Sequence, residues 1–477
     1  MIKFLKLLSA CAVCFFSFIT QVFSQALPDE INKVLREHRI LKQDISLVVQ
    51  AVDEDLPRIA FNSEIPRNPA SVIKVVTSWA ALDLLGPTFN WVTKIYALGV
   101  IKNGILEGDL VVKGGGDPYL TLDEFWRMLG ELRRNGLHTI KGDLVFDDSL
   151  YNAGESDLNP LDGESYHLYN VSPHPFLVNF KAIDFVINPI RNTGQVDIKT
   201  VPHLPNLVVT NNIKLTRKPC RGSGPRIIMA QAKSNSPDHI VLSGRMPRSC
   251  KNYRLGRTAM THASYAYGVF KTLWSQWGGS LQGSFRTEVL KNPGSLLLSW
   301  KSRPLAEIIR PLNKLSNNVM TRMLLLTVAE TKFNPPVDRE KGVITILEHL
   351  QKIGVDTNGL HIENGSGLSR KTRVSATQMT ELLRLAWVKP HMPEFVASLS
   401  IGGQDGTTRK RFRRSRVKGN SHLKTGSLKD VSSVTGYMHN DRGKTFTVTL
   451  IINSPAVKFG AGRAVQDATL DWVLNQR

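Results

Sequence analysis

The chain has 477 residues, 42% hydrophobic and 21% charged, which excludes a single small domain and favours a globular protein of roughly two to four domains. Lys and Arg number 61 against 40 Asp and Glu, a formal net charge of +21. Such a basic protein is drawn to polyanions, and the charge alone does not choose among a nucleic acid, an anionic membrane and an anionic wall polymer.

The first 26 residues resemble a secretory signal. Lys3 and Lys6 precede an apolar run over residues 7–23, and small residues follow up to Ala26, so we predict a signal peptide over residues 1–26 and an exported, periplasmic protein. Export argues against a nucleic-acid partner. Two alternatives stay open: a lipoprotein cleavage box at residues 8–11, and an uncleaved anchor, although the run is short for a membrane span.

The cysteines agree with export. Cys11 and Cys14 would leave with the signal peptide, and Cys220 and Cys250 remain. An even pair in an oxidising compartment predicts one disulfide, and two unpaired buried thiols are the alternative.

A helix near the start of the mature chain carries the first chemical motif. A short polar helix over residues 27–43 and a hairpin over 44–62 precede it. Asn68 can cap this helix, and Gly86-Pro87 ends it near Leu85. Because it is apolar on nearly every side, we expect it to be buried. Ser71 and Lys74 then lie one turn apart on one face, where a desolvated amine can act as a base toward the hydroxyl.

The Ser-x-x-Lys pattern is weak by itself, because it recurs at Ser415/Lys418 and Ser421/Lys424. Only the pair at Ser71 and Lys74 lies in a capped, apolar helix.

The pattern of apolar and polar residues changes over residues 88–285. Short alternating segments separated by Gly, Asn, Asp and Pro predict a β-rich region, which a helix over 120–135 interrupts. The stretch 151–179 is expected to be an ordered loop, and contact with a substrate is its alternative interpretation.

Helical periodicity returns near residue 305. We predict a helical stretch over 304–326, interrupted around Pro311, and then the following helices and strands. The helices span residues 339–353, 375–388 and 461–474, and the strands span 431–438 and 445–452. The basic run 409–418 is expected to be a solvated loop, with retention of an anionic polymer as the alternative.

Two further patterns each occur once. Ser316-Asn317-Asn318 lies within the helical stretch, and Lys424-Thr425-Gly426 comes just before the strand 431–438.

Each pattern suits one task in acyl transfer. Ser71 would attack a carbonyl, Lys74 would take its proton, and Ser316 would relay that proton to the departing amine. The remaining candidates would bind the substrate: the amide of Asn318, the cation and hydroxyl of Lys424 and Thr425 toward a terminal carboxylate, Gly426 for close approach of a substrate backbone, and the N–H groups of Ser71 and Ser427 as an oxyanion hole. The 12 histidines include no His-x-x-x-His pair with an associated Glu, so we expect no metal and no cofactor.

The order Ser-x-x-Lys, Ser-x-Asn, Lys-Thr-Gly resembles the signature of penicillin-binding proteins and serine β-lactamases. Further blocks at residues 69–74, 108–118, 365–370 and 404–407 resemble one family in particular. This is the D-alanyl-D-alanine carboxypeptidase/endopeptidase family of low-molecular-mass class C penicillin-binding proteins, peptidase family S13. Asn364 departs from that pattern, since an aspartate is expected before the Gly-Ser-Gly block.

The resemblance implies an α/β (α+β) fold, a penicillin-binding/β-lactamase-like transpeptidase domain with an antiparallel sheet flanked by helices and with inserted β-rich domains. Residues 27–87 and 286–477 would form the catalytic domain, and 88–285 an insert of two small domains. The implied partners are D-alanyl peptides of peptidoglycan and β-lactam antibiotics as covalent inhibitors, with a peripheral association with membrane or anionic wall polymer left open. The alternatives are a β-lactamase, which the long interval between Ser71 and Ser316 argues against, and a non-catalytic basic wall-polymer-binding protein.

Overall fold

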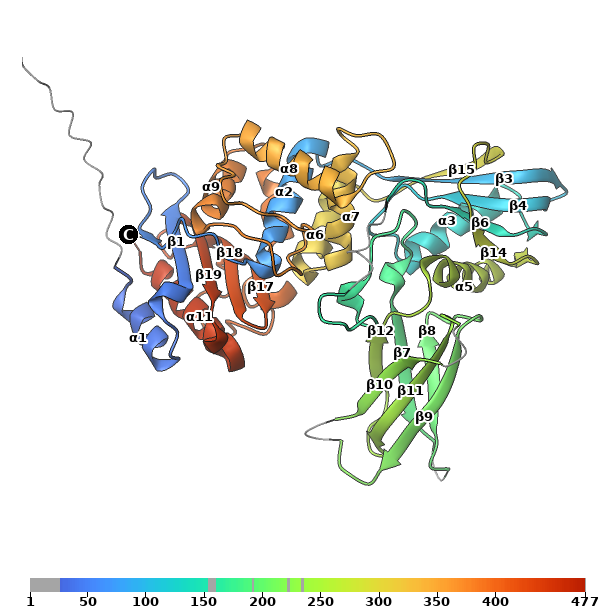
Figure 1. The fold of residues 1–477 in the computed structure, drawn as a ribbon, viewed down its shortest axis with the longest axis horizontal. Helices are drawn as coiled ribbons and strands as arrows, with labels where there is room; N and C mark the ends of the chain where they lie inside the picture. Colours follow the sequence, from blue (N-terminus) through green and yellow to red (C-terminus); the bar gives the residue numbers. More distant parts are fainter. Residues whose placement is uncertain (1–25, 153–159, 191–192, 221–223, 233–235, 477) are drawn as a thin grey trace, which may run out of the picture.

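The computed structural model describes residues 26–152, 160–190, 193–220, 224–232 and 236–476. The predicted signal peptide therefore lies outside the described residues, apart from Ala26. None of the helices in the described part of the chain is both long and apolar enough to cross a membrane. Figure 1 shows a part built from both chain ends, in blue and orange to red, and a separate part built from the middle of the chain.

A six-stranded antiparallel sheet forms the centre of the first part, with the order β16-β17-β18-β19-β1-β2. Its strands are β1 (Ile45–Ala51), β2 (Ile59–Phe61), β16 (Ser400–Ile401), β17 (Ser421–Leu428), β18 (Val431–His439) and β19 (Thr445–Asn453). Pairing of Ile45 with Ile452 joins the beginning of the described chain to its end. Both faces of β1 are buried, so helices must cover the sheet on both sides.

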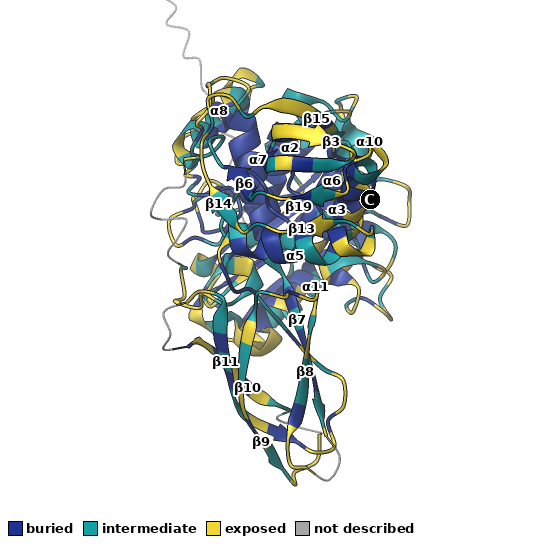
Figure 2. Ribbon diagram, turned by 90° about the vertical axis from the view of Figure 1, so that its right-hand side faces the viewer, coloured by how far each residue is buried: buried dark blue, intermediate teal, exposed yellow. Residues whose placement is uncertain are grey.

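Eight helices of the described residues surround this sheet. They are α1 (Asp29–Glu37), α2 (Lys74–Leu85), α6 (Leu305–Leu315), α7 (Asn318–Ala329), α8 (Arg339–Lys352), α9 (Ala376–Trp387), α10 (Met392–Ser398) and α11 (Ala461–Leu474). Helices α1 and α11 share a core with Leu47 and Leu450 on one face of the sheet. Helices α2 and α6 to α10 pack together on the other face. Figure 2 shows α2 and α7 in dark blue, in the interior of the molecule.

Short 3₁₀ turns connect several of these elements. They are η1 (Lys42–Asp44), η2 (Ala70–Ile73), η3 (Leu168–Asn170), η4 (Asn179–Lys181), η5 (Gly406–Thr408) and η6 (Pro455–Gly460). The turn η2 leads directly into α2, so the first turn of the predicted helix is tighter than an α-helix.

The middle of the chain forms a second part with its own hydrophobic core. Its larger sheet contains β3 (Val92–Lys102), β4 (Ile105–Lys113), β5 (Thr139–Ile140), β6 (Leu144–Asp147), β13 (Ser280–Leu281), β14 (Phe285–Thr287) and β15 (Ser295–Lys301). Helices α3 (Leu122–Arg134) and α5 (His262–Gln276) belong to the same part. The sequence analysis missed α5, whose aromatic and β-branched residues are typical of strands.

Two three-stranded sheets, β12-β7-β8 and β10-β11-β9, extend from this second part (Figure 1). Their strands are β7 (Ile183–Pro189), β8 (Val196–Val201), β9 (Val208–Thr216), β10 (Arg226–Gln231), β11 (His239–Pro247) and β12 (Tyr253–Arg257). Phe185 and Leu242, one from each sheet, belong to the same core. The predicted disulfide between Cys220 and Cys250 is present.

The pairing of β15 bears on the predicted boundary at residue 286. Leu298 pairs with Ile95 of β3, so β15 extends the sheet of the second part. We therefore propose that the inserted region continues to about residue 301, because a strand belongs to the unit that provides its hydrogen bonds.

The predicted interruption of the helical stretch 304–326 was placed at the wrong residue. Pro311 lies inside α6, and the helical stretch is interrupted at Ser316 instead. A proline removes only one helical hydrogen bond, whereas the left-handed φ of 57° at Ser316 turns the chain out of the helix. The Lys424-Thr425-Gly426 motif lies in β17, just before the predicted strand 431–438, which is β18. The predicted helix 27–43 ends earlier, at Glu37, and only the turn η1 follows it. The other predicted helices and strands agree with the structure within a few residues.

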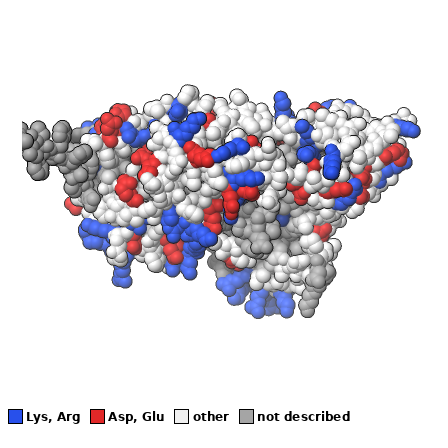
Figure 3. Space-filling view, turned by 45° about the horizontal axis from the view of Figure 1, so that its top comes forward, with Lys and Arg blue, Asp and Glu red and all other residues white. Residues whose placement is uncertain are grey.

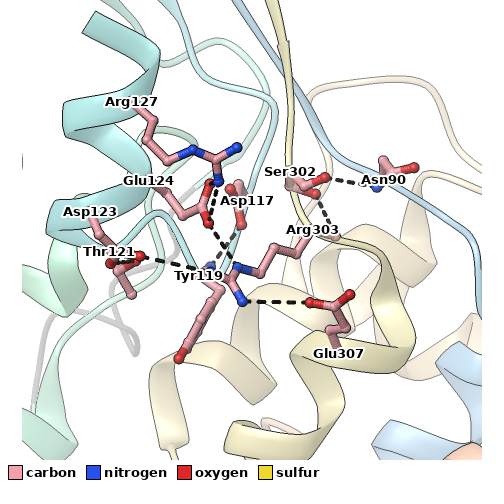
Figure 4. A network of polar contacts seen from close by, with 10 residues as sticks. All are labelled: Asn90, Asp117, Tyr119, Thr121, Asp123, Glu124, Arg127, Ser302, Arg303 and Glu307. Atoms are coloured by element: carbon pink, nitrogen blue, oxygen red, sulfur yellow. Dashed lines mark hydrogen bonds and ion pairs between the residues drawn. The ribbon is translucent and has the colours of Figure 1, made fainter. Parts of the chain in front are cut away.

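A polar network at the start of α6 joins the two parts (Figure 4). Arg303 follows β15, and its guanidinium lies 2.8 Å from Glu124 and 3.7 Å from Asp123, both on α3. The same guanidinium lies 3.6 Å from Glu307 on α6. Glu124 is buried and also pairs with Arg127. One arginine therefore links a helix of the second part to a helix of the first.

Candidate active site

The first motif lies at the beginning of α2. The Asn68 side chain accepts a hydrogen bond from the Ala70 N–H at 2.9 Å. Contrary to the prediction, Asn68 is not the cap of a helix, because Pro69 precedes η2, Ile73 precedes α2, and neither element has a side-chain cap. Ser71 is half-buried within η2, and Lys74 begins α2. The Lys74 Nζ lies 3.1 Å from the Ser71 Oγ, so the predicted amine and hydroxyl are in direct contact.

The Lys74 amine has no exposed surface and is surrounded by oxygen atoms. It donates to the Asn318 Oδ1 at 2.7 Å and to the Ser366 carbonyl. Burial is the main cause that lowers the pKa of Lys74 well below its ordinary value, and the positive charges of Lys424 and Arg322 add to it. The lower pKa favours the neutral form of the amine, and a neutral amine beside Ser71 can accept the proton of the hydroxyl.

Asn364 stabilises the turn whose Ser366 carbonyl accepts from Lys74. Its Nδ2 donates to the Leu368 carbonyl at 2.9 Å, and its Oδ1 accepts from the Ser366 N–H at 3.0 Å. A carboxylate would accept the second bond but could not donate the first. The departure from the family pattern thus has a local role, since the asparagine closes the turn that carries the Ser366 carbonyl.

The second motif occupies the break between α6 and α7. Ser316 has left-handed backbone geometry, and Asn318 starts α7. The Ser316 Oγ accepts a hydrogen bond from the Lys424 Nζ at 2.8 Å. The Asn318 Nδ2 donates to the Tyr169 carbonyl at 3.0 Å, so the loop 151–179 reaches the site through its backbone.

The third motif brings a second buried lysine. Lys424 on β17 has no exposed surface, and its Nζ also donates to its neighbour's carbonyl, that of Thr425, at 2.9 Å. Burial lowers the pKa of Lys424 to about 7. The lysine therefore carries its charge on the acid side of neutrality, where it can attract a substrate carboxylate.

Gly426 allows β17 to lie against η2. A Cβ atom at this position would lie 2.5 Å from the Pro69 carbonyl oxygen and 3.0 Å from the Ser71 nitrogen. Only glycine avoids these backbone contacts, and the Ser71 N–H is thereby held beside the strand that continues into Ser427. Their predicted role as an oxyanion hole stays a prediction.

A cavity of about 520 Å³ opens above these residues. Of the predicted site residues, it is lined by Ser71, Ser316, Thr425, Gly426 and Ser427. The other three predicted site residues do not line the cavity and are buried: Lys74, Asn318 and Lys424. The structure thus brings all three motifs together, and Cys220 and Cys250 belong to the other part of the molecule.

The sequence analysis assigned no role to several residues that shape this site. The Ser366 and Tyr169 carbonyls accept from Lys74 and Asn318, and the Thr407 Oγ1 lies 2.8 Å from the Thr425 Oγ1. Ser366 and Thr407 lie in the blocks 365–370 and 404–407, which resemble the family. That resemblance is the sequence signal from which their position at the site could have been predicted. Backbone carbonyls such as that of Tyr169 leave no signal, because every residue has one.

The basic run 409–418 is less solvated than predicted. Arg411 donates to Gln466 at 2.9 Å and pairs with Asp467, both on α11. Arg409 and Lys410 are exposed and line the cavity, as does Arg463 on α11. Part of the run therefore packs against a helix, and part of it forms a wall of the site. Among the described residues, no group of three or more His, Cys, Asp or Glu side chains could hold a metal ion.

The chain is similar to known proteins over most of its length. The chain matches the D-Ala-D-Ala carboxypeptidase 3 (S13) family over residues 27–476. The D-alanyl-D-alanine carboxypeptidase DacB of Haemophilus influenzae is 25% identical over 455 residues, which cover 94% of each chain. A D-alanyl-D-alanine carboxypeptidase of an Actinomadura species is 26% identical over 428 residues, which cover 84% of this chain and 75% of that one.

Solved structures show the same fold. The crystal structure of penicillin-binding protein 4 (dacB) from Haemophilus influenzae has a TM-score of 0.79 at 23% identity, and the match covers 93% of this chain and 98% of that chain. A structure of that protein with a novel β-lactam has a TM-score of 0.74 at the same identity and coverage. The predicted α/β fold with additional β-rich sheets is confirmed.

Proposed function

Because the chain belongs to the D-Ala-D-Ala carboxypeptidase 3 (S13) family of serine peptidases, we propose that it is an exported DD-peptidase with carboxypeptidase and endopeptidase activity. It would remove the terminal D-alanine of peptidoglycan stem peptides and cut the D-alanyl cross-links between them. The observation that carries the proposal is the contact of Ser71 with the buried Lys74, beside the Ser316–Lys424 pair, at one cavity.

The proposed reaction begins with proton transfer from the Ser71 Oγ to the neutral Lys74 amine. The oxygen attacks the D-alanyl carbonyl, and the negative charge that develops is stabilised by the N–H groups of Ser71 and Ser427. The C–N bond then breaks, and the proton passes through the Ser316 hydroxyl to the departing amine. Water hydrolyses the acyl-Ser71 ester and releases the shortened peptide.

Substrate binding would use the second lysine. The charge of Lys424 and the hydroxyl of Thr425 suit the carboxylate of the departing D-amino acid. Asn318, already bonded to Lys74, would orient the amine and contact the peptide backbone. A β-lactam carries an acyl group and a carboxylate in the same relation, so we expect penicillin to acylate Ser71 covalently.

Labelling with a fluorescent penicillin tests this assignment. The mature protein should take up one label, and mass spectrometry of the digest should place it on Ser71. Ser71→Ala and Lys74→Ala should lose the label. Ser415→Ala is the matched control, since it removes the serine of another Ser-x-x-Lys pattern and should label like the parent. A label that persists in Ser71→Ala would exclude the proposed nucleophile.

The rate at which the label is released separates the alternatives. A DD-peptidase should hold the penicilloyl group for long periods and release D-alanine from a D-alanyl-D-alanine peptide. Rapid turnover of a chromogenic cephalosporin would indicate a β-lactamase instead. Salt-sensitive binding to sacculi without any D-alanine release would indicate a non-catalytic wall-polymer-binding protein.

A further inference from the structure

The active-site cavity extends beyond the three motifs to a basic wall made of Arg409, Lys410 and Arg463. We propose that this basic wall binds a second carboxylate in the leaving group of the substrate, beyond the carboxylate that Lys424 and Thr425 would bind. The preferred substrates would then be D-alanyl peptides whose departing amine belongs to a larger, anionic peptide, as in a cross-link. This inference rests on the proposed function, and it names the substrate class that the site favours.

The position of the wall places it on the leaving-group side. Thr425 is the proposed ligand of the carboxylate next to the departing amine, and its hydroxyl contacts that of Thr407. Arg409 and Lys410 follow Thr407 after one residue, and they line the same cavity. A leaving group that continues past the carboxylate at Thr425 therefore meets the basic wall.

The charges of Arg409 and Lys410 are available to a ligand, whereas Arg411 is engaged by other side chains and Arg463 lies in the field of Asp467 on the same helix. Arg411 is held by Gln466 and Asp467 and also stacks on the Phe412 ring. Arg409 and Lys410 are exposed, and no carboxylate of the described residues lies within ion-pair distance of their side chains. Their positive charges are therefore not neutralised locally.

The size of the cavity also exceeds what one terminal D-alanine needs. At about 520 Å³ it falls in the range of pockets that enclose a drug-sized ligand, roughly 300–1,000 Å³. One exposed ion pair contributes little, but three cations around one concave site add their fields and strengthen the attraction for an anion.

Two peptides that differ only in one leaving-group charge test the proposal. Both have the acyl part diacetyl-L-lysyl-D-alanine, and the departing residue is D-glutamate in one and its neutral isostere D-glutamine in the other. The full mature protein should cleave the D-glutamate peptide with a kcat/KM about fivefold higher or more. This ratio should fall as NaCl is raised from low concentration to about 0.5 M, because salt screens exposed charges.

Arg409→Gln/Lys410→Gln should bring the ratio of the two kcat/KM values close to one, and Arg463→Gln should reduce it partly. The matched control is Arg413→Gln/Arg414→Gln, which removes the same charge from the same run at residues that do not line the cavity, and it should keep the ratio. A parent ratio near one, or an equal drop in the control, would overturn the proposal. Failure to cleave any D-alanyl-D-alanine peptide would instead overturn the proposed function.

Discussion

At the scale of single residues, the site is defined by two buried lysines. The partners of Lys74 are the oxygens of Ser71, Asn318 and Ser366, and those of Lys424 are the oxygens of Ser316 and Thr425. These oxygens are uncharged, so they only partly replace the hydration that each ammonium loses. The proton affinity of both amines falls for this reason, and the charge of Lys424 lowers the pKa of Lys74 further.

A buried lysine should make stability depend on pH. The pKa of Lys424 is about 7 in the folded protein against an ordinary value of 10.5, so between these values the unfolded chain binds more protons than the folded one. The free energy of unfolding should therefore rise with pH from about 7 to about 10. Lys424→Met removes this contribution, and its Tm relative to the parent should be highest at pH 6 and decline toward pH 9.

Thermal unfolding at pH 6 and pH 9 checks the prediction. Lys429→Met is the control, because Lys429 is exposed at the end of the same strand, and its Tm difference from the parent should not vary with pH. A pH-independent difference for Lys424→Met would show that the folded-state pKa of Lys424 is close to its ordinary value.

At the scale of elements, the site is built where helices and strands end or meet. Ser71 lies in the 3₁₀ turn before α2, and Ser316 lies in the break between α6 and α7. Gly426 lies where β17 touches η2. Such positions expose hydroxyl and N–H groups that the interior of a regular element would use for its own hydrogen bonds.

The left-handed backbone of Ser316 makes two substitutions distinguishable. Ser316→Gly and Ser316→Ala both remove the hydroxyl, so both should slow acylation by penicillin about 100-fold or more. Glycine adopts a φ of 57° without strain, and Ser316→Gly should therefore be more stable than Ser316→Ala by about 0.5–1 kcal/mol. Urea denaturation of the two variants measures the difference. Equal stabilities would mean that the backbone at this residue is not strained.

A methyl group at Gly426 should separate β17 from η2. The added Cβ would meet two backbone atoms, the Pro69 oxygen and the Ser71 nitrogen, and neither can rotate away. We expect Gly426→Ala to slow acylation about 100-fold, since a displacement of about 1 Å is enough for such a loss. Gly256→Ala is the control, because the nearest neighbours of its added Cβ are side-chain atoms of Asp184 at 3.3 Å and Leu168 at 3.5 Å, not backbone atoms. Stopped-flow measurement of penicillin acylation gives both rates.

At the scale of the whole molecule, the inserted part is attached to the catalytic part by packing and by charge. The Trp91 Nε1 donates to the Thr327 Oγ1 at 2.9 Å, and Val171 and Leu177 pack against Val319 and Met323 on α7. Figure 3 shows basic and acidic side chains intermingled over both parts on the face that it draws. On that face basic side chains also gather in groups along the lower part of the view.

The ion pairs of Arg303 should contribute to this attachment. Arg303→Met leaves the buried carboxylate of Glu124 with only its pair to Arg127, whose side chain is 59% exposed. Because Arg303 is itself partly exposed, we expect a loss of about 1–2 kcal/mol of unfolding free energy. In a double-mutant cycle, Glu124→Gln should recover part of the loss.

Arg134→Met is the control for Arg303→Met, because Arg134 is exposed in the last turn of α3. It should change the unfolding free energy by less than about 0.5 kcal/mol. The cycle would contradict the prediction if the effects of Arg303→Met and Glu124→Gln were simply additive.

Features that depend on neighbours along the chain could be predicted from the amino-acid sequence. The helix 461–474 was predicted with its observed bounds, and Ser71 and Lys74 were placed on one turn, because helical periodicity is a local property. The pairing of Cys220 with Cys250 followed from their number and the expected compartment. The resemblance of three short motifs and four blocks led to the family.

The contacts between distant segments could be known only from the folded structure. It placed Lys74 against Asn318 and Lys424 against Ser316, it moved the helix break to Ser316, and it turned part of a predicted solvated loop into a wall of the cavity. The physical reason is that these features depend on sheet pairing and on exclusion of water between elements far apart in the chain. No local pattern records either, and the proton affinities of the two lysines exist only after both are buried.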